Sequence, residues 1–333
     1  MEQTSKIYVA GHSGLVGSAM VRRLRALGYS NLLLRSHQQL DLTDQREVQQ
    51  FFSEERPEYV FLAAAKVGGI LANDTYPADF FGQNIRIQTN VIHEAYRARV
   101  NRLLFLGSSC IYPKFAPQPL KEEYLLTGPL EETNRAYAVA KIAGIEMCWS
   151  YNQQYGTRFI AAMPTNLYGE GDRYDLQSSH VIPAMIRKFH EAKVTGAGKV
   201  VLWGTGTPRR EFLYSDDAAD ACIFLMNLKD NEADAILADK LTHAVINVGR
   251  GEDLTIRELS ELITSVVGFR GEIIFDPSKP DGTPRKLMDI SRLSALGWKP
   301  GIFLREGLAI TYRHFLKEHE IRPGPARISA GLV

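Results

Sequence analysis

The sequence predicts an α/β protein with a doubly wound parallel sheet and a smaller C-terminal α/β domain. Short, continuous apolar runs alternate with helical patterns through the first half, as expected for buried parallel strands covered by helices on both faces. A glycine-rich turn at residues 11–17 joins the first run to the first helix. The length of 333 residues corresponds to about two domains.

Four apolar runs in the first half predict strands at residues 7–10, 31–34, 59–65 and 103–106. Apolar residues recur at helical spacing between them, at 15–27, 46–52 and 85–100. Gly28 is the expected stop of the first helix. Because ligands of such sheets bind outside the carboxyl ends of the strands, the residues just after each run are candidate site residues.

The second half is less regular. We expect a loop at 167–179, helices at 181–192, 255–267 and 304–316, a strand at 200–204 followed by a turn-rich loop at 205–210, and a strand at 245–248 that returns to the sheet. The predicted domains are therefore 1–170, with a return segment near 215–250, and 171–321. Residues 322–333 lack periodicity and are expected to form a loose tail.

Composition excludes several classes of protein. Hydrophobic residues make up 45% and charged residues 23%, with a net charge of +1, which argues against a disordered chain and against a nucleic-acid-binding surface. The three cysteines, Cys110, Cys148 and Cys222, have no zinc-ligand spacing. No apolar stretch is long enough to span a bilayer. We expect a cytoplasmic enzyme without a metal or a membrane partner.

The turn Gly11-His12-Ser13-Gly14-Leu15-Val16-Gly17 has GxxGxxG spacing. Between a strand and a helix, such glycines allow the backbone and the helix N-terminus to approach a pyrophosphate, although tight packing alone can also require them. This context predicts a dinucleotide site on a Rossmann-type doubly wound sheet. Arg35, and no acid, follows the second strand, which favours a 2′-phosphate and hence NADP(H); a solvated loop arginine is the alternative. Asp41 and Leu42 are expected beside the adenine.

Tyr137 and Lys141 lie four residues apart on a predicted helix, so both project from one face. A phenol needs a nearby cation to act as an acid or base at neutral pH, and Lys141 supplies it. Ser108, at the end of a predicted strand, could hydrogen-bond the same carbonyl as Tyr137.

Together with LAAA at 62–65 and YAVAK at 137–141, these motifs resemble the extended short-chain dehydrogenase/reductases. Further strings resemble the branch of that family that acts on GDP-4-keto-6-deoxy-D-mannose: AAKVGGI at 64–70, GSSCIYP at 107–113, PTNLYG at 164–169, SHVIP at 179–183, WGTG at 203–206, REF at 210–212 and KPDGTPRK at 279–286. The resemblance extends from about Lys6 to Phe315.

The resemblance implies epimerisation of that sugar at C3 and C5, followed by NADPH reduction at C4, to give GDP-L-fucose. Inversion needs acid–base groups beyond the tyrosine, and the family uses the positions of Cys110 and His180; which of them is the base is left open. It also implies a homodimer formed through residues 85–100 and 137–151. The implied cofactor residues are Gly11, Ser13, Gly14, Leu15, Val16, Gly17, Arg35, Asp41, Leu42, Ala64, Lys141, Pro164 and His180. The implied substrate residues are Ser109, Asn166, Lys188, Trp203, Arg210 and Lys286. Lys188, Arg210 and Lys286 could pair with the GDP diphosphate and Trp203 could lie against guanine or sugar; solvated charges and a core tryptophan are the alternatives.

Two departures from the family pattern matter for the cofactor and the phosphate contacts. Ser13 and His37 stand where some bacterial members have arginine, so the 2′-phosphate would rest mainly on Arg35. Lys188 replaces an arginine of some relatives and keeps the charge with a different geometry. Two other functions stay open at this level: a nucleotide-sugar epimerase or dehydratase that retains NAD, and an NADP-binding sensor without turnover.

Overall fold

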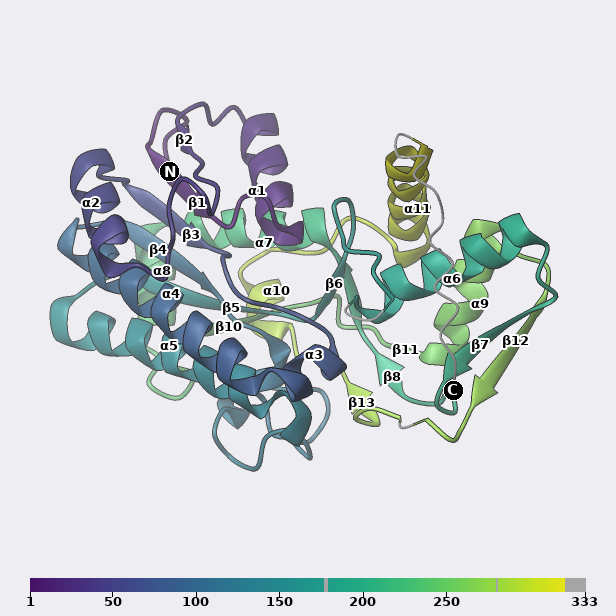
Figure 1. Cartoon of the computed structure of the whole chain (residues 1–333). Coiled ribbons are helices and arrows are strands. Elements are labelled where there is room, and N and C mark those ends of the chain that lie inside the picture. The colour runs from purple at the N-terminus through teal and green to yellow at the C-terminus, as the bar shows by residue number, and fades with distance from the viewer. Residues whose placement is uncertain (177–178, 280, 321–333) are drawn as a thin grey trace.

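The computed structural model of the protein describes residues 1–176, 179–279 and 281–320. Its largest sheet has six parallel strands in the order β10-β5-β4-β3-β1-β2 (Figure 1). The strands are β1 (Ile7–Ala10), β2 (Leu32–Leu33), β3 (Tyr59–Leu62), β4 (Arg102–Leu106), β5 (Phe159–Pro164) and β10 (Val245–Val248). The α/β class and the parallel sheet that the sequence predicts are confirmed.

Helices cover both faces of this sheet. Alternate residues of β1 face opposite sides: Ile7 and Val9 belong to one buried cluster, and Tyr8 and Ala10 to another. The first cluster includes α1 (Leu15–Ala26), α7 (Ser215–Met226), α8 (Asp230–Leu237) and α10 (Ser291–Ala295). The second includes α2 (Gln45–Glu55), α4 (Pro77–Arg97) and α5 (Arg135–Tyr155). Because both faces are covered, the strands read as continuous apolar runs.

The strand order reverses between β1 and β3, the topological switch point of the sheet. There, Gly11 after β1 and Ala64 after β3 are in direct backbone contact, because a Cβ added to Gly11 would lie 2.7 Å from the Ala64 nitrogen. Short segments extend from this edge of the sheet: α3 (Ile70–Thr75) and the 3₁₀ turns η1 (Ser109–Ile111), η2 (Glu122–Tyr124) and η3 (Glu132–Asn134). The predicted nucleotide turn is therefore at the ligand-binding edge of the sheet.

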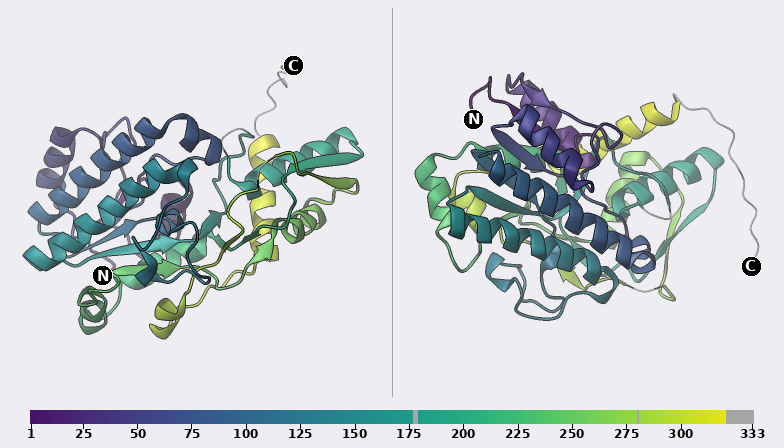
Figure 2. Two further views of the ribbon diagram at one scale, coloured as in Figure 1. Left: turned by 90° about the horizontal axis from the view of Figure 1, so that it is seen from below. Right: turned by 60° about the vertical axis from the view of Figure 1, so that its left-hand side comes forward.

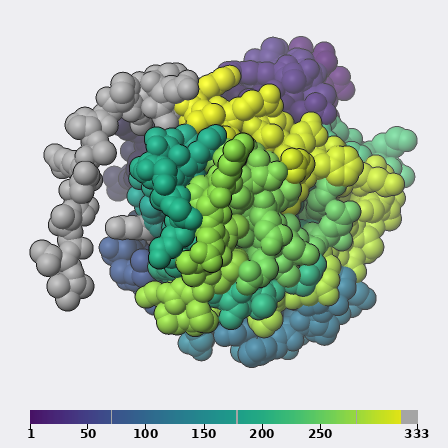
Figure 3. All heavy atoms as spheres, turned by 90° about the vertical axis from the view of Figure 1, so that its right-hand side faces the viewer, coloured from purple at the N-terminus to yellow at the C-terminus, as the bar shows by residue number. Residues whose placement is uncertain are grey.

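The smaller part of the molecule begins where β5 ends, since only Thr165 separates it from β6 (Asn166–Tyr168). Its own buried cluster unites α6 (Val181–Thr195), α9 (Ile256–Val267) and α11 (Leu304–Glu320). Three small sheets complete it: β6 with β9 (Phe212–Tyr214), β7 (Lys199–Trp203) with β12 (Glu272–Asp276), and β8 (Arg209–Arg210) between β11 (Leu254–Thr255) and β13 (Arg285–Lys286). Figure 2 shows this part at one end of the sheet, and Figure 3 shows its outer surface, built from segments far apart in the chain.

The predicted helices and strands compare with the structure as follows: one prediction is confirmed, one is partly wrong, and some elements were not predicted. The return of residues 245–248 to the sheet is confirmed by the pairing of β10 with β5. The turn-rich loop at 205–210 is partly wrong, because Arg209 and Arg210 form β8; a two-residue strand is defined by its partners and has no periodicity of its own. β5, α7, α8 and β12 were not predicted. Pro280 and the expected tail at 322–333 lie outside the described residues, and the domain boundaries stay a prediction.

No described helix is both long enough and apolar enough to cross a membrane.

Gly144 tests how closely α5 packs on the sheet. A Cβ at this position would lie 2.5 Å from Cζ of Phe105 on β4 and 2.9 Å from Oε1 of Gln88 on α4. Gly144→Ala should therefore destabilise the fold by about 1–3 kcal/mol, despite the better helix propensity of alanine. Urea unfolding measures the change.

Gly82 on α4 is the matched control, because an added Cβ there would meet only Arg86 Nη2, at 3.9 Å. Gly82→Ala should stabilise by about 0.5–1 kcal/mol. Equal effects of the two substitutions would contradict the close packing of α5.

Candidate active site

The glycine turn leaves the N-terminus of α1 open to an anion. Gly14 caps the helix without a side-chain hydrogen bond, and the first turn has no acidic residue. Gly17 must be glycine, since a Cβ would lie 2.0 Å from the Gly11 carbonyl oxygen. His12 Nδ1 is buried and has no hydrogen-bond partner among the described residues. Free helix-terminal N–H groups next to an unpaired buried polar atom fit the pyrophosphate of a dinucleotide.

Arg35, expected at a 2′-phosphate, is held by α2. Its guanidinium lies 2.5 Å from Oε1 of Glu55 and 5.8 Å from the centre of the Phe51 ring. Binding a phosphate there would require Arg35 to share its charge with Glu55 or to leave it. Asp41 accepts hydrogen bonds from the backbone and hydroxyl of Thr43, which hold the pKa of its carboxyl below the ordinary value.

Helix α5 presents Tyr137 and Lys141 to the end of β4. Lys141 is buried and its Nζ donates to the Leu106 carbonyl at 2.8 Å. The same nitrogen lies 4.7 Å from the Phe105 ring centre and 5.9 Å from the Tyr137 ring centre. Burial lowers the pKa of Lys141 to about 8, and burial raises the pKa of Tyr137 well above its usual value. In the free protein the tyrosine is therefore a proton donor at neutral pH.

Ser108 joins Tyr137 to Cys110. Its hydroxyl lowers the pKa of both side chains, which places it close to each of them, and its Oγ accepts from the Cys110 backbone N–H at 3.5 Å, so that it caps η1. Cys110 is only 8% exposed, and burial raises the pKa of its thiol. The structure thus brings together a serine, a phenol and a thiol at one strand end, with Lys141 beside them.

Arg210 and Lys286 approach this group from the smaller part of the molecule. β13 pairs with β8 in a register that sets Lys286 opposite Arg210. Lys286 interacts electrostatically with both Cys110 and Arg210, and desolvation lowers its pKa. Lys286 was expected at the substrate diphosphate, and its closeness to Cys110 was not predicted.

The other predicted residues are more dispersed. His180 is the N-cap residue of α6; its side chain is solvent-exposed, although desolvation by the surrounding protein lowers its pKa. It has no hydrogen bond to another described side chain. Asn166 Nδ2 donates to the Glu211 carbonyl at 2.9 Å, and Lys188 Nζ to the Val201 carbonyl at 3.4 Å. Trp203 is 63% exposed, with Lys279 Nζ 5.9 Å above its ring.

The remaining predicted residues lie at strand ends on the same edge. Ala64 follows β3, Pro164 ends β5, and Ser109 is buried in η1. Leu42 packs against the buried cluster beneath α2 and α4.

Glu211 is a further residue that the motif analysis did not single out. Its side chain is fully buried and accepts hydrogen bonds from the backbone N–H groups of Arg250, Gly251 and Met288, at 2.5, 2.7 and 2.9 Å. The sequence signal for it was its place in the string REF at 210–212, an acid directly before the apolar run that begins at Phe212.

This geometry defines a class of protein: a dinucleotide fold whose Tyr-x-x-x-Lys pair and serine meet at the end of a central strand. The profile described as "NAD dependent epimerase/dehydratase family" matches residues 7–249, so the chain belongs to that family. Two similar relatives are GDP-L-fucose synthase 1 of Arabidopsis thaliana, 58% identical over 95% of this chain and 94% of its own length, and GDP-L-fucose synthase of Escherichia coli K12, 54% identical over 95% and 98%.

Solved structures give the same grouping. A GDP-6-OMe-4-keto-L-xylo-heptose reductase from C. jejuni is 42% identical with a TM-score of 0.90, over 96% of this chain and 99% of that one. A GDP-L-fucose synthetase from Naegleria fowleri bound to NADP is 26% identical with a TM-score of 0.84, over 96% of each chain.

Lys141→Met tests the electrostatic cost of the buried lysine. Because the pKa is about 8 in the folded protein and about 10.4 in an unfolded chain, the unfolded state binds more protons between these values. The stability of the wild type therefore rises with pH through this interval. At pH 7 the variant should be more stable than the wild type by about 1–3 kcal/mol, and the difference should shrink by pH 9.5.

Urea unfolding at the two pH values measures this difference. Lys199→Met, at an exposed residue of β7, is the control and should show no such pH dependence. A Lys141→Met protein that is less stable than the wild type at both pH values would contradict the assignment.

Proposed function

We propose that this protein converts GDP-4-keto-6-deoxy-D-mannose to GDP-L-fucose, by epimerisation at C3 and C5 and NADPH-dependent reduction at C4. The observation that supports it most is the position of Ser108, whose Oγ accepts from the Cys110 backbone N–H and whose hydroxyl interacts with the side chains of both Tyr137 and Cys110. A reductase needs only the serine, tyrosine and lysine, whereas inversion of a carbon next to a ketone needs additional acid–base groups. The curated relatives named GDP-L-fucose synthase support the choice of substrate.

The cofactor would lie along the edge of the sheet at β1. The open helix terminus behind Gly14 would hold its pyrophosphate, and Lys141 would hydrogen-bond the nicotinamide ribose. Arg35 would meet the 2′-phosphate, which is the basis for proposing NADPH in preference to NADH. When bound, NADPH supplies the hydride that reduces C4.

Epimerisation depends on the acidity that the C4 ketone gives to the hydrogens on C3 and C5. Ser108 and Tyr137 would hydrogen-bond O4 and stabilise the negative charge that develops there when a proton leaves either carbon. Cys110 and His180 would remove a proton from one face of the ring and return one to the other. His180 belongs to the smaller part of the molecule, so the sugar would lie between the two parts.

Reduction then uses Tyr137 in the protonation state that its environment favours. Its pKa is raised, so the phenol keeps its proton until the C4 oxygen becomes basic and accepts it. The positive charge of Lys141 stabilises the phenolate that remains. Lys188, Arg210 and Trp203 would hold the GDP part of the substrate.

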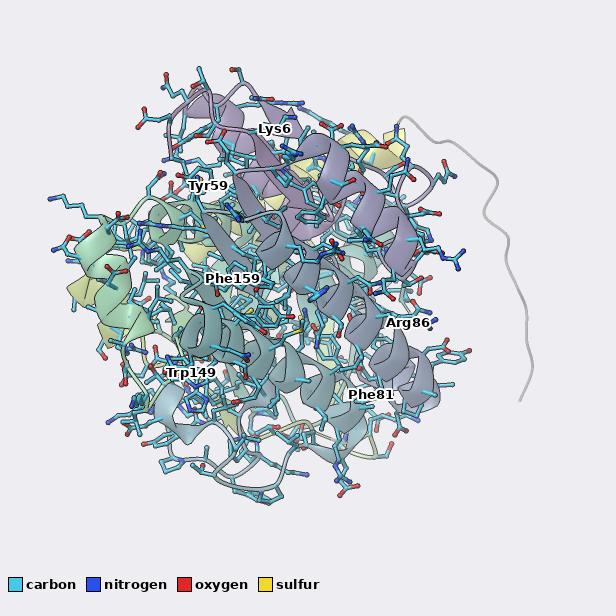
Figure 4. The ribbon with its side chains drawn as sticks, turned by 90° about the vertical axis from the view of Figure 1, so that its left-hand side faces the viewer. Lys6, Tyr59, Phe81, Arg86, Trp149 and Phe159 are labelled. Carbon is cyan, nitrogen blue, oxygen red and sulfur yellow. The ribbon has the colours of Figure 1, made fainter. Side chains whose placement is uncertain are left out.

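We propose a homodimer formed through α4 and α5. These helices lie side by side on one face of the molecule, with Phe81 and Arg86 on α4 (Figure 4). An aromatic group lies between them: Tyr96 stacks on Tyr155 with centres 4.3 Å apart, and His93 Nδ1 is 2.7 Å from the Tyr151 hydroxyl. Light scattering that gives the mass of one chain would exclude the dimer.

The three cysteines are free, which supports a cytoplasmic location.

NADPH oxidation and hydrogen exchange together distinguish the proposed reaction from two other activities. A C4 reductase without epimerase activity would oxidise NADPH but exchange no hydrogen at C3 or C5. An epimerase or dehydratase that retains its cofactor would turn over without consuming NADPH.

Isotope exchange distinguishes the roles of Tyr137 and Cys110. In D₂O without NADPH, the wild type should incorporate deuterium at C3 and C5 of GDP-4-keto-6-deoxy-D-mannose, as followed by NMR. Tyr137→Phe should retain part of this exchange and lose NADPH oxidation by a factor of about 10²–10⁴, because a positioned proton donor contributes that much. Cys110→Ser should suppress exchange by a similar factor.

Cys148→Ser is the matched control, because Cys148 is buried in the core away from the site; it should change neither activity. The proposal fails if the wild type exchanges neither hydrogen.

A further inference from the structure

Two cations are held side by side where the smaller part of the molecule meets the catalytic group. Strands β8 and β13 are parallel, and their register pairs Arg210 with Lys286. Paired residues of neighbouring strands project from the same face, and like charges in this position repel each other. Such a pair is stabilised by negative charge close by.

Most negative groups around the two cations already have partners. Asp281 interacts with Arg210 and is also fixed by the backbone and hydroxyl of Thr205, at 3.0 and 2.7 Å. Glu131 interacts with Lys286 but forms an ion pair with Lys114 at 2.9 Å. Within the described residues, Lys286 Nζ has neither a hydrogen bond nor an ion pair. Of the groups that interact with Lys286, namely Cys110, Arg210 and Glu131, Cys110 is the one that can become an anion and has no ion pair of its own among the described residues.

The groups that surround Cys110 also indicate that it interacts with Lys286. Desolvation favours its neutral thiol, and the groups that favour the thiolate are Lys286, then the Ser108 hydroxyl, then Lys141. Tyr137 also faces it, as an uncharged phenol. Lys286 therefore opposes the desolvation of Cys110 more strongly than any group of the Ser-Tyr-Lys set.

Backbone hydrogen bonds fix Lys286 relative to Cys110. Gln118 and Leu120 follow η1 closely in the chain. The residue after Lys286, Leu287, receives a hydrogen bond on its carbonyl from Leu120 N at 2.7 Å and donates its own N–H to Gln118 Oε1 at 2.9 Å. The segment after η1 and the end of β13 thus form one unit.

We propose that Lys286 is a positioning residue for epimerisation, whose ammonium group stabilises the thiolate of Cys110. The inference rests on the proposed function and adds a role to the diphosphate contact expected of this lysine. In the step concerned, the Cys110 thiolate takes a proton from carbon and becomes a thiol. The electron pair of the broken C–H bond moves into the ring and places the negative charge on O4. His180, on the other face of the ring, returns a proton to the carbon when the enolate collapses, and the configuration is inverted.

Alkylation of the free protein by iodoacetamide tests the proposal without substrate, so its outcome is independent of the proposed reaction. Only the thiolate reacts, and peptide mass mapping separates Cys110 from Cys148 and Cys222, which are each 1% exposed. Lys286→Met should shift the pH of half-maximal Cys110 alkylation upward by about one unit, with a roughly tenfold slower reaction at pH 7. Lys286→Arg should restore most of the rate.

Lys188→Met is the matched control, since Lys188 is also expected at the substrate but does not interact with Cys110. It should leave the alkylation profile unchanged. If Lys286→Met also leaves the profile unchanged, and raises only the KM for substrate, Lys286 serves the diphosphate alone and the proposal is overturned. If Lys286→Met does not fold, the comparison of wild type with Lys286→Gln decides by the same criterion. Should Lys286→Gln fold and alkylate like the wild type, the proposal is likewise overturned.

Discussion

The buried carboxylate of Glu211 is the interaction on which the geometry of the site depends. Within the part of the chain that the structure describes, it has no cationic partner, and its oxygens accept hydrogen bonds from backbone N–H groups of two separate segments, the loop after β10 and the end of β13. A buried carboxylate without such donors would be prohibitively unstable. The contact of the two segments at Glu211 therefore stabilises the charged form of this side chain in the folded protein.

The position of Glu211 in the chain gives this contact its functional meaning. Glu211 lies between Arg210 on β8 and Phe212 on β9. The same short stretch of backbone therefore directs the Arg210 side chain toward the site and the Phe212 side chain toward the core. Its carbonyl accepts from Asn166 and Thr165 just beyond β5. Gly249 must be glycine, because a Cβ there would lie 2.4 Å from Glu211 Oε1. Strand ends of the large sheet and short strands of the smaller part are thereby joined at one point.

Two kinds of element meet at this junction. The large sheet supplies rigid positions: Ser108 at the end of β4 and the Tyr137–Lys141 pair on α5, which is packed closely on Phe105. The smaller part supplies charges on two-residue strands whose order comes from hydrogen bonds to other segments. The residues proposed for reduction thus belong to the large sheet, and the charged residues proposed to hold the substrate belong to the smaller part. This division fits a family in which one cofactor-binding fold serves different nucleotide sugars.

The sequence alone predicted those parts of the site whose chemically important residues belong to a regular local pattern. The glycine turn, the helix with Tyr137 and Lys141, and the strand before Ser108 all follow from periodicity and spacing. β8 and β13 could not be predicted, because strands of two residues have no period and exist through pairing across about 75 residues of chain. The closeness of Lys286 to Cys110 depends on that pairing, so only the folded structure reveals it. The contact of Arg35 with Glu55 likewise joins residues 20 apart, which no local motif encodes.

Hydrogen–deuterium exchange of the backbone amides tests the central role of Glu211 most directly. In the wild type we expect the amides of Arg250, Gly251 and Met288 to be protected, because each donates to the Glu211 carboxylate. Glu211→Gln replaces one acceptor oxygen by an amide donor, so either the Arg250 and Gly251 amides, which share Oε1, or the Met288 amide, which donates to Oε2, should lose protection while those of β1 and β3 keep theirs. Unchanged protection at Arg250, Gly251 and Met288 in a folded Glu211→Gln protein would contradict the dependence of the site on this carboxylate.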